Sequence, residues 1–292
     1  MLKETVFSYI LNGSKVYSAF LDFSKAFDKV NFNVLFKRMI DLNFPVQYVK
    51  FIHNWYIKQY VRVTFDGAMS GPWKIRNGVR QGGILSPFLF NIYIDVLLEE
   101  VTSLSVGCKL GHFMSNIIAY ADDVVVLAPS ITALQRILDT CSSTAKLLKL
   151  NFNTKKSVCM QFHKNCKISD NSRSNNFRIG NDLLQNVNEV VYLGFNITSN
   201  MCNNKDIIRE RNKFYNRFNS ILRKFYSVNL DVFLVLFKSF CFSFYGCELW
   251  FRNFNCKLVL KSFSVGFHKS VKKIIGVPWC ESNYVVCEAL GL

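Results

Sequence analysis

The sequence predicts an α+β protein whose second part is wholly helical. Half of its 292 residues are apolar and 19% are charged, which is the composition of a folded chain. Short β-prone runs alternate with helical patterns up to about residue 200, and only helical spacing follows Asn203. We therefore expect a sheet packed on helices in residues 1–200 and a helical domain in residues 201–292.

The first elements are a buried strand and two helices. "KVYSAFLDF", residues 15–23, is short, apolar and β-prone, so it predicts a strand. The following residues have helical apolar spacing, and Pro45 suits the start of a second helix. "YVRVTFDG" and "GPWKIRNG" are each bounded by glycine and predict two strands.

A loop and a long helix come next. We expect Ser86 to cap this helix, with Pro87 at its first position. One face of the helix is apolar and is expected to pack on the core: Leu89, Tyr93, Leu97 and Val101.

Two acids interrupt the apolar stretch "NIIAYADDVVVLAPS", residues 116–130. It predicts a hairpin with Asp122 and Asp123 at its tip, and it contains no Lys, Arg or His to neutralise them. Buried carboxylates are normally paired, protonated or bound to a metal. Asp22, at the end of the first strand, is a third acid after an apolar run. Three such Asp can hold two Mg²⁺ ions, whereas a solvated turn and a strand-end cap are the simpler alternatives.

Residues 131–157 predict an amphipathic helix and a basic turn, and "VCMQF" and "EVVYLGFNIT" predict strands on either side of a polar loop. In the helix after Asn203, we expect an apolar face and a basic face. The apolar face comprises Ile208, Arg211, Tyr215, Phe218, Leu222 and Phe225. The basic face comprises Arg209, Lys213, Arg217, Arg223 and Lys224, with too few acids, Asp206 and Glu210, to balance it.

The positive charge lies mainly in the second half. Residues 1–144 carry 14 basic and 11 acidic residues, a net of +3, and residues 145–292 carry 22 and 9, a net of +13. A polyanionic partner is indicated, nucleic acid rather than an anionic membrane surface. Lys238 and Glu248 interrupt the most apolar stretch, residues 231–251, so we expect no membrane span.

Ten cysteines occur without a Cys-x-x-Cys pair, and the N-terminus lacks the layout of a secretory signal. We expect reduced core cysteines in an intracellular protein. Cys159, His163 and Cys166 are spaced like zinc ligands, but no fourth ligand is evident, so a zinc site is the weaker interpretation.

Five motifs follow one another in a recognisable order: "FLDFSKAFDKV", "NGVRQGGILSPFLFNIYID", "AYADDVVVLAPS", "LNFNTKKS" and "YLGFNIT". With them the chain resembles the palm and thumb of a non-LTR (LINE-type) retrotransposon reverse transcriptase. The resemblance implies a palm, an antiparallel sheet packed on helices, followed by an α-helical thumb and post-thumb region. It implies RNA-directed DNA polymerase activity: transfer from dNTPs to the 3′-OH of a DNA primer on an RNA template, with two Mg²⁺ ions or Mn²⁺ as an alternative. A nuclear or cytoplasmic location is expected for an element-encoded enzyme.

The resemblance also implies roles for individual residues. Asp22 and Asp122 would be the main metal ligands, with Asp123 a weaker third. Phe27 matches the steric gate, an aromatic ring that crowds a ribose 2′-OH and so favours deoxynucleotides; a core phenylalanine is the alternative. Gln81 and Gly82 match a loop near the incoming nucleotide, with an ordinary loop as the alternative.

Lys156 matches a lysine near the triphosphate, unless it is only a solvated charge. Tyr192, Leu193 and Gly194 match the hairpin that grips the primer end, unless they are strand core. The basic face of the helix after Asn203 would follow the phosphates of the template–primer duplex.

Only 21 residues precede Asp22, where this family has a fingers subdomain. We therefore expect a fragment, a truncated gene product or a decayed copy that binds an RNA/DNA hybrid in a salt-sensitive way but extends it weakly or not at all. The alternatives are a catalytically inactive nucleic-acid-binding remnant, a group II intron maturase-type reverse transcriptase and a viral RNA polymerase. Ala121 before the Asp pair, together with Phe27, favours an enzyme that makes DNA. Target site and oligomeric state are not predicted.

Overall fold

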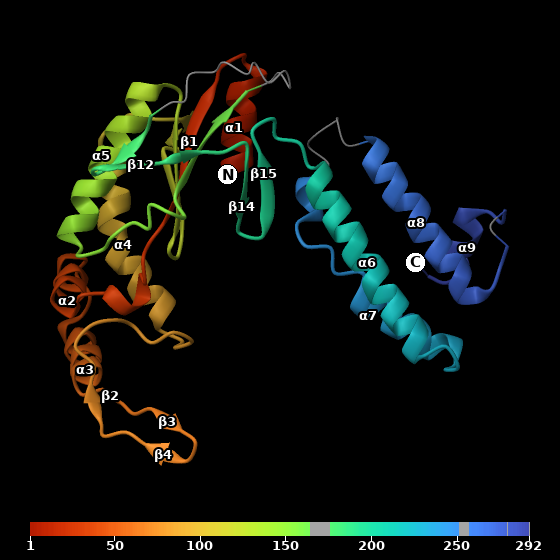
Figure 1. The fold of residues 1–292 in the computed structure, drawn as a ribbon, viewed down its shortest axis with the longest axis horizontal. Coiled ribbons are helices and arrows are strands. Elements are labelled where there is room, and N and C mark those ends of the chain that lie inside the picture. The colour runs from red at the N-terminus through yellow and green to blue at the C-terminus, as the bar shows by residue number, and fades with distance from the viewer. Residues whose placement is uncertain (164–175, 251–256, 279, 292) are drawn as a thin grey trace. The chain divides into compact units, whose positions relative to one another are not determined.

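The computed structural model describes residues 1–163, 176–250, 257–278 and 280–291. The chain divides into two compact units, Met1–Asn188 and Glu189–Leu292 (Figure 1). Each is described by itself below.

A five-stranded sheet forms the centre of the first unit. Its order is β13 (Gln185–Asn186), β10 (Val158–Phe162), β1 (Val16–Asp22), β9 (Asp123–Ala128) and β8 (Ile117–Tyr120). All neighbouring pairs are antiparallel except β10 and β13. The predicted first strand and the predicted hairpin, β8–β9, are thus confirmed, and they lie next to each other in the sheet.

Helices pack on this sheet because alternate strand residues present an apolar face. The helices of the unit are α1 (Leu2–Leu11), α2 (Phe32–Asp41), α3 (Val46–Ile57), α4 (Ser86–Ser103) and α5 (Ile131–Leu147). The main core joins Ala19 and Leu21 of β1 and Val124 and Val126 of β9 to residues of α4 and α5. The apolar face predicted for α4 is confirmed, since its four residues are buried.

The predicted cap of α4 is wrong. Helix α4 begins at Ser86, and Leu85 occupies the cap position without a side-chain hydrogen bond. The Leu89 N–H donates to the Leu85 carbonyl at 3.0 Å, so the first helical turn starts one residue earlier than predicted. The buried Ser86 hydroxyl has no hydrogen-bond partner in the described part of the chain.

A two-tiered hairpin follows α3, and we call residues 44–80, which include both, the arm (Figure 1). Strands β2 (Tyr60–Val61) and β5 (Trp73–Lys74) pair near α3, and β3 (Thr64–Phe65) and β4 (Ala68–Met69) pair at the tip. The tip turn, Asp66-Gly67, has φ of 47° and 77°, values typical of a two-residue hairpin turn.

Short elements complete this unit: the 3₁₀ turn η1 (Phe27–Lys29) and the pairs β6 (Lys109–Leu110) with β7 (Phe113–Met114) and β11 (Arg178–Ile179) with β12 (Asp182–Leu183).

The second unit consists of a hairpin and helices. Its elements are β14 (Glu189–Tyr192), β15 (Phe195–Thr198), α6 (Asn204–Lys224), α7 (Leu230–Cys241), η2 (Cys247–Leu249), α8 (Lys257–Ile275) and α9 (Asn283–Ala289). Phenylalanines dominate its core, where Phe214 and Phe218 of α6 pack with Phe233 and Phe237 of α7. None of the helices within the described ranges is long and apolar enough to cross a membrane.

The apolar face predicted for α6 is partly wrong. Ile208 and Phe225 are exposed, whereas Ile207, Phe214 and Ile221 are buried. The buried face also contains Asp206 and Glu210, each only 1% exposed. Apolar spacing alone did not predict the buried face, because two of its residues are acids.

Candidate active site

Asp22 and Asp123 lie directly opposite each other. They form the last residue pair of the β1–β9 ladder, so their side chains leave the same face of the sheet. That face is opposite to the one that α4 and α5 cover, because Leu21 and Val124 next to them face the core. Asp122 lies in the adjoining hairpin turn beside Ala121, whose φ is 51°. Strand register and the turn thus gather the three predicted acids at one edge of the sheet.

The three carboxylates interact electrostatically. Burial raises the pKa of Asp123, and the charges of Asp122 and Asp22 raise it further, while Lys156 opposes the shift. The Lys156 amine is 4.0 Å from a carboxylate oxygen of Asp22 and is 70% exposed. One exposed amine facing three carboxylates leaves excess negative charge, which suits a hard divalent cation. Within the described ranges, no three His, Cys, Asp or Glu side chains already surround a common point as metal ligands.

The segment from Leu150 to Ser157 holds Asp22 in place. The Asn153 N–H donates to the Asp22 carbonyl at 2.7 Å, and the Asp22 N–H donates to the Ser157 hydroxyl at 3.1 Å. Phe23 stacks on Phe152 with ring centroids 4.4 Å apart. These contacts also bring Lys156 to the acids. Ser157 was not among the predicted site residues, and its only signal in the sequence is its place directly after the basic turn.

Phe27 combines packing with partial exposure. It lies in η1 and stacks on Phe90 of α4, with centroids 4.7 Å apart. Phe90 is fully buried, whereas Phe27 is half-buried. Phe27 thus packs against the core and stays partly exposed.

Backbone bonds tie the loop before α4 to η1. The Val79 N–H donates to the Phe27 carbonyl and the Gly78 N–H to the Val30 carbonyl, both at 2.8 Å. Gln81 and Gly82 follow in an exposed part of this loop. The structure thus brings the Gln81 loop to the element that carries Phe27.

Gly78 permits this close approach. Its φ is +91°, and a Cβ there would lie 2.8 Å from the Asp28 carbonyl oxygen. We expect Gly78→Ala to lower the free energy of unfolding of the first unit by about 3 kcal/mol or more, since left-handed strain and a backbone clash combine. Gly82 also has positive φ, but its Cβ would meet nothing within 4 Å. Gly82→Ala should cost only about 1 kcal/mol. Urea denaturation measures both, and equal losses would show that the contact with Asp28 is unimportant.

The β14–β15 hairpin of the second unit is fixed at its tip. Leu193 and Gly194 form the turn, with φ of 46° and 77°. Arg209 of α6 donates to the Gly194 carbonyl at 2.6 Å, and the Tyr245 hydroxyl donates to the Leu193 carbonyl at 3.0 Å. The hairpin containing Tyr192, Leu193 and Gly194 therefore forms one body with α6.

Most of the predicted basic face has intramolecular partners. Arg209 lies 3.3 Å from Asp206 and 3.2 Å from Glu210, and Lys213 lies 2.8 Å from Glu210. Arg217 donates to the carbonyl of Ser243 at 2.9 Å. Arg223 and Lys224 are exposed, and the structure gives neither an ion pair within its described ranges. Asp206 and Glu210 thus neutralise Arg209 and Lys213, although they are too few to balance the whole basic face.

A pair of variants separates anchoring from phosphate binding. We expect Arg209→Gln to lower the free energy of unfolding by about 2–3 kcal/mol, because it removes the ion-pair partner of the buried Asp206 and one of the two partners of the buried Glu210. Arg223→Gln should leave stability unchanged. It should reduce the slope of log binding constant against log salt concentration for hybrid binding by about one. Thermal denaturation and salt titrations measure the two effects. An unaltered melting temperature for Arg209→Gln would contradict the anchoring role.

The weak zinc interpretation gains no support from Cys159. Its side chain is fully buried, and burial raises the pKa of its thiol to about 12. Cys166 lies outside the described residues.

Sequence comparison identifies the family. A sequence model described as "Reverse transcriptase (RNA-dependent DNA polymerase)" matches residues 5–197, about two thirds of the chain. The chain belongs to the reverse transcriptase family. Reverse transcriptases generally use divalent metal ions, which agrees with the excess negative charge at the three acids.

The curated relatives of this reverse transcriptase come from non-LTR retrotransposons, which confirms the predicted resemblance. One is a Pol polyprotein of the type-2 element R2DM from Drosophila melanogaster, 30% identical over 190 residues. The match covers 63% of this chain and 18% of that protein. Another is the RNA-directed DNA polymerase of the mobile element jockey from Drosophila funebris, 27% identical over 275 residues, which covers 90% of this chain and 28% of that protein. The chain thus spans less than a third of the length of these relatives.

Solved structures confirm the fold class, an α+β palm followed by a helical thumb. The telomerase of Candida tropicalis in complex with a fragment of telomeric RNA superposes with a TM-score of 0.53 at 12% identity. The superposition covers 99% of this chain and 51% of that one. At this identity the comparison concerns the fold alone.

Proposed function

We propose that this chain catalyses RNA-directed DNA synthesis, in which dNTPs are added to the 3′-OH of a DNA primer paired with an RNA template. The observation that carries the proposal is the placement of Asp22 opposite Asp123, beside Asp122, where strands β1 and β9 meet at their ends. Membership of the reverse transcriptase family supports the same reaction. We further propose residues 1–200 as the palm and residues 201–292 as the thumb and post-thumb region.

Asp22, Asp122 and Asp123 would hold two Mg²⁺ ions, with Mn²⁺ as an alternative. When bound, such ions lower the pKa of the attacking hydroxyl and stabilise the charge on the transferring phosphate and the leaving pyrophosphate. The donor set supports this, since all three ligands are hard carboxylate oxygens and their charge is unbalanced. Lys156, beside Asp22, supplies a positive charge for the triphosphate.

Three further groups of residues orient the substrates in this proposal. The Phe27 ring, which stacks on Phe90, would exclude a 2′-OH. Gln81 and Gly82 would line the nucleotide position from a loop bonded to the same element. Tyr192, Leu193 and Gly194 would hold the primer end, and Arg209 anchors that hairpin. Arg223 and Lys224 would contact duplex phosphates, together with Lys213 and Arg217.

A copying assay with two templates tests the proposal. A labelled DNA primer is annealed to an RNA template or to a DNA template of the same sequence, and each dNTP is offered singly. The proposal predicts addition of only the complementary dNTP on RNA, and its loss with EDTA. Addition without regard to the template base would contradict it. Salt-sensitive hybrid binding with no addition under any condition would instead identify a non-catalytic binding protein.

A further inference from the structure

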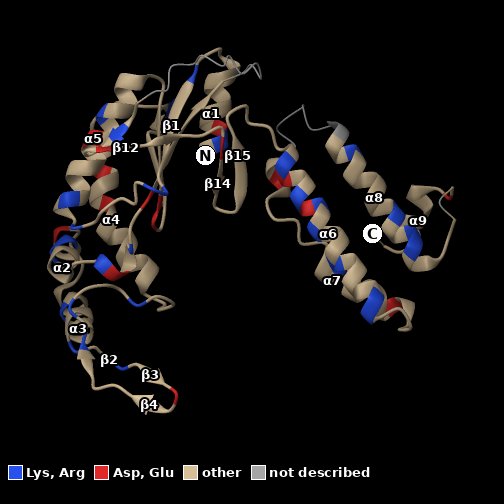
Figure 2. Cartoon of the chain, in the orientation of Figure 1, with Lys and Arg blue, Asp and Glu red and all other residues tan. Residues whose placement is uncertain are grey.

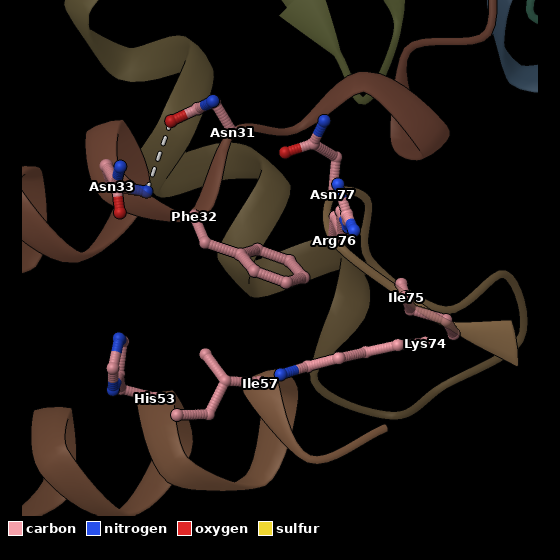
Figure 3. A pocket seen from close by; sticks show the side chains of 9 residues that line it. All are labelled: Asn31, Phe32, Asn33, His53, Ile57, Lys74, Ile75, Arg76 and Asn77. Carbon is pink, nitrogen blue, oxygen red and sulfur yellow. Dashed lines mark hydrogen bonds between the residues drawn. The ribbon is translucent and has the colours of Figure 1, made fainter. Parts of the chain in front are cut away.

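A polar hollow lies in the first unit, and its lining includes none of the three acids. It has a volume of about 220 Å³ and lies between the start of α2, the end of α3 and the segment around β5. Three basic side chains line it, namely His53, Lys74 and Arg76, together with the amides of Asn31, Asn33 and Asn77. Figure 3 shows the Lys74 side chain reaching across the hollow towards Ile57 of α3, above which lies the Phe32 ring.

The charge of this hollow suits an anion. No carboxylate lines it, and neither Lys74 nor Arg76 has an ion-pair partner in the described part of the chain. The arm as a whole contains six Lys and Arg and one acid, Asp66. That acid lies in the turn between β3 and β4, at the far end of the arm (Figure 2). The positive end of the α2 dipole also lies here, where the Asn31 side chain accepts hydrogen bonds from the Asn33 and Val34 N–H groups.

Exposed rings accompany this charge. The register of β2 with β5 pairs Tyr60 with Lys74, so both side chains leave the same face of the hairpin. Tyr60 is 57% exposed. Other large exposed side chains of the arm include Tyr48, Phe51, Trp55, Phe65 and Trp73. Cations beside exposed aromatic rings are typical of surfaces that bind single-stranded nucleic acid, whose phosphates contact the cations while its bases stack.

A second hollow continues this one towards the proposed nucleotide loop. It has a volume of about 390 Å³, shares Ile75 and Asn77 with the first hollow, and extends to Arg80 and Gln81. A strand bound by Lys74 and Arg76 would thus lead to the loop that we assign to the incoming nucleotide.

We propose that the hollow of Lys74 and Arg76, with the Tyr60 ring beside it, binds single-stranded RNA. The amides of Asn33 and Asn77 both donate and accept hydrogen bonds, which lets them recognise the ribose 2′-OH. The inference deepens the proposed function and rests on it in one respect: the bound strand is the part of the template not yet copied.

The test is binding of a fluorescein-labelled ten-nucleotide RNA, followed by anisotropy without metal or dNTP. We expect the double variant Lys74→Ala, Arg76→Ala to weaken binding about 10-fold or more and to flatten the log–log salt dependence by about 1.4, the value for two phosphate contacts on a single strand. Tyr60→Leu should weaken binding about 5-fold or more without changing the salt dependence, because stacking releases no counterions.

The matched control is Lys15→Ala, Lys37→Ala, which removes the same charge at exposed positions of the first unit outside both hollows. It should leave RNA affinity within about 2-fold of the wild type. Equal losses for the two double variants would overturn the site, since net charge alone would then explain binding. Equal affinity for DNA of the same sequence would overturn the assignment to RNA.

Two further readings separate this inference from its rivals. Sedimentation of the wild type and of Tyr60→Leu tests whether the arm is instead a surface for a second copy of the chain. Dimers lost in Tyr60→Leu, with RNA binding unchanged, would overturn the proposal. Because the binding assay needs no catalysis, failure of the copying assay would overturn the proposed function and leave this RNA site standing. Normal copying, with RNA binding unaffected in the Lys74, Arg76 variant, would overturn this site alone.

Discussion

Asn in place of Asp22 or Asp122 is expected to abolish DNA synthesis while the fold persists. Each change removes one ligand charge from a site that must concentrate positive charge on the transferring phosphate. The loss should be about 10³-fold or more in the rate of single-nucleotide addition, in keeping with several kcal/mol of transition-state stabilisation by bound cations. Rapid-quench primer extension measures the rate, and circular dichroism verifies the fold.

The same acids should oppose folding when no metal is present. The pKa of Asp123 is raised, so its ionisation at neutral pH costs stability. Protonated Asp123 contributes to the free energy of unfolding at low pH. This contribution is lost as the pH rises through the raised pKa of Asp123 in the folded state. Asp123→Asn should therefore raise the metal-free melting temperature by about 1–3 °C at pH 7 and reduce the stabilisation by added Mg²⁺.

Asp41→Asn is the control for this stability test, because Asp41 is exposed and lies at the end of α2. It should retain both the wild-type melting temperature and its response to Mg²⁺. Equal Mg²⁺ stabilisation of Asp123→Asn and the wild type would show that this carboxylate takes no part in metal binding.

Phe27→Val is expected to admit ribonucleotides. The shorter side chain vacates the space that a 2′-OH would occupy, and steric discrimination of this kind is worth about 10- to 200-fold. The ratio of kcat/KM for a dNTP to that for the matching NTP should fall by that factor. Removing the stack on Phe90 should also lower the free energy of unfolding, by about 1–3 kcal/mol.

Phe90→Leu distinguishes the gate from the core. This variant loses the same stacked pair but leaves the Phe27 ring in place, so it should lose stability with little change in sugar discrimination. If both variants lost stability and neither changed discrimination, Phe27 would be a packing residue only.

Local patterns explain why the site could be predicted. Strand alternation and the turn at Ala121 follow from neighbouring residues, so the sequence alone predicts a hairpin with Asp122 and Asp123 at its tip. The pairing of Asp22 with Asp123 is a contact between distant segments, yet two apolar strands ending in acids suggested it. The predicted cap of α4 was wrong for a local reason, because Leu85 takes the cap position and Ser86 becomes the first helical residue.

A buried group of ion pairs and a hollow built from separate segments are the features that the sequence did not predict. Asp206 and Glu210 belong to the buried face of α6 because Arg209 and Lys213 neutralise them there, and apolar spacing contains no sign of such pairs. The hollow of Lys74 and Arg76 is assembled from residues around the start of α2, from α3 and from the segment around β5. The net charge of the first half of the sequence did not indicate this hollow. That half is nearly neutral as a whole, although its arm is strongly basic.

Single-nucleotide addition by the wild type and by Asp122→Asn tests the central claim most directly. A labelled DNA primer on an RNA template is incubated with the complementary dNTP and Mg²⁺, and the product one nucleotide longer is quantified. The three-carboxylate assignment predicts a Mg²⁺-dependent product with the wild type and none with Asp122→Asn at the same affinity for the hybrid. Equal product from both proteins would contradict it.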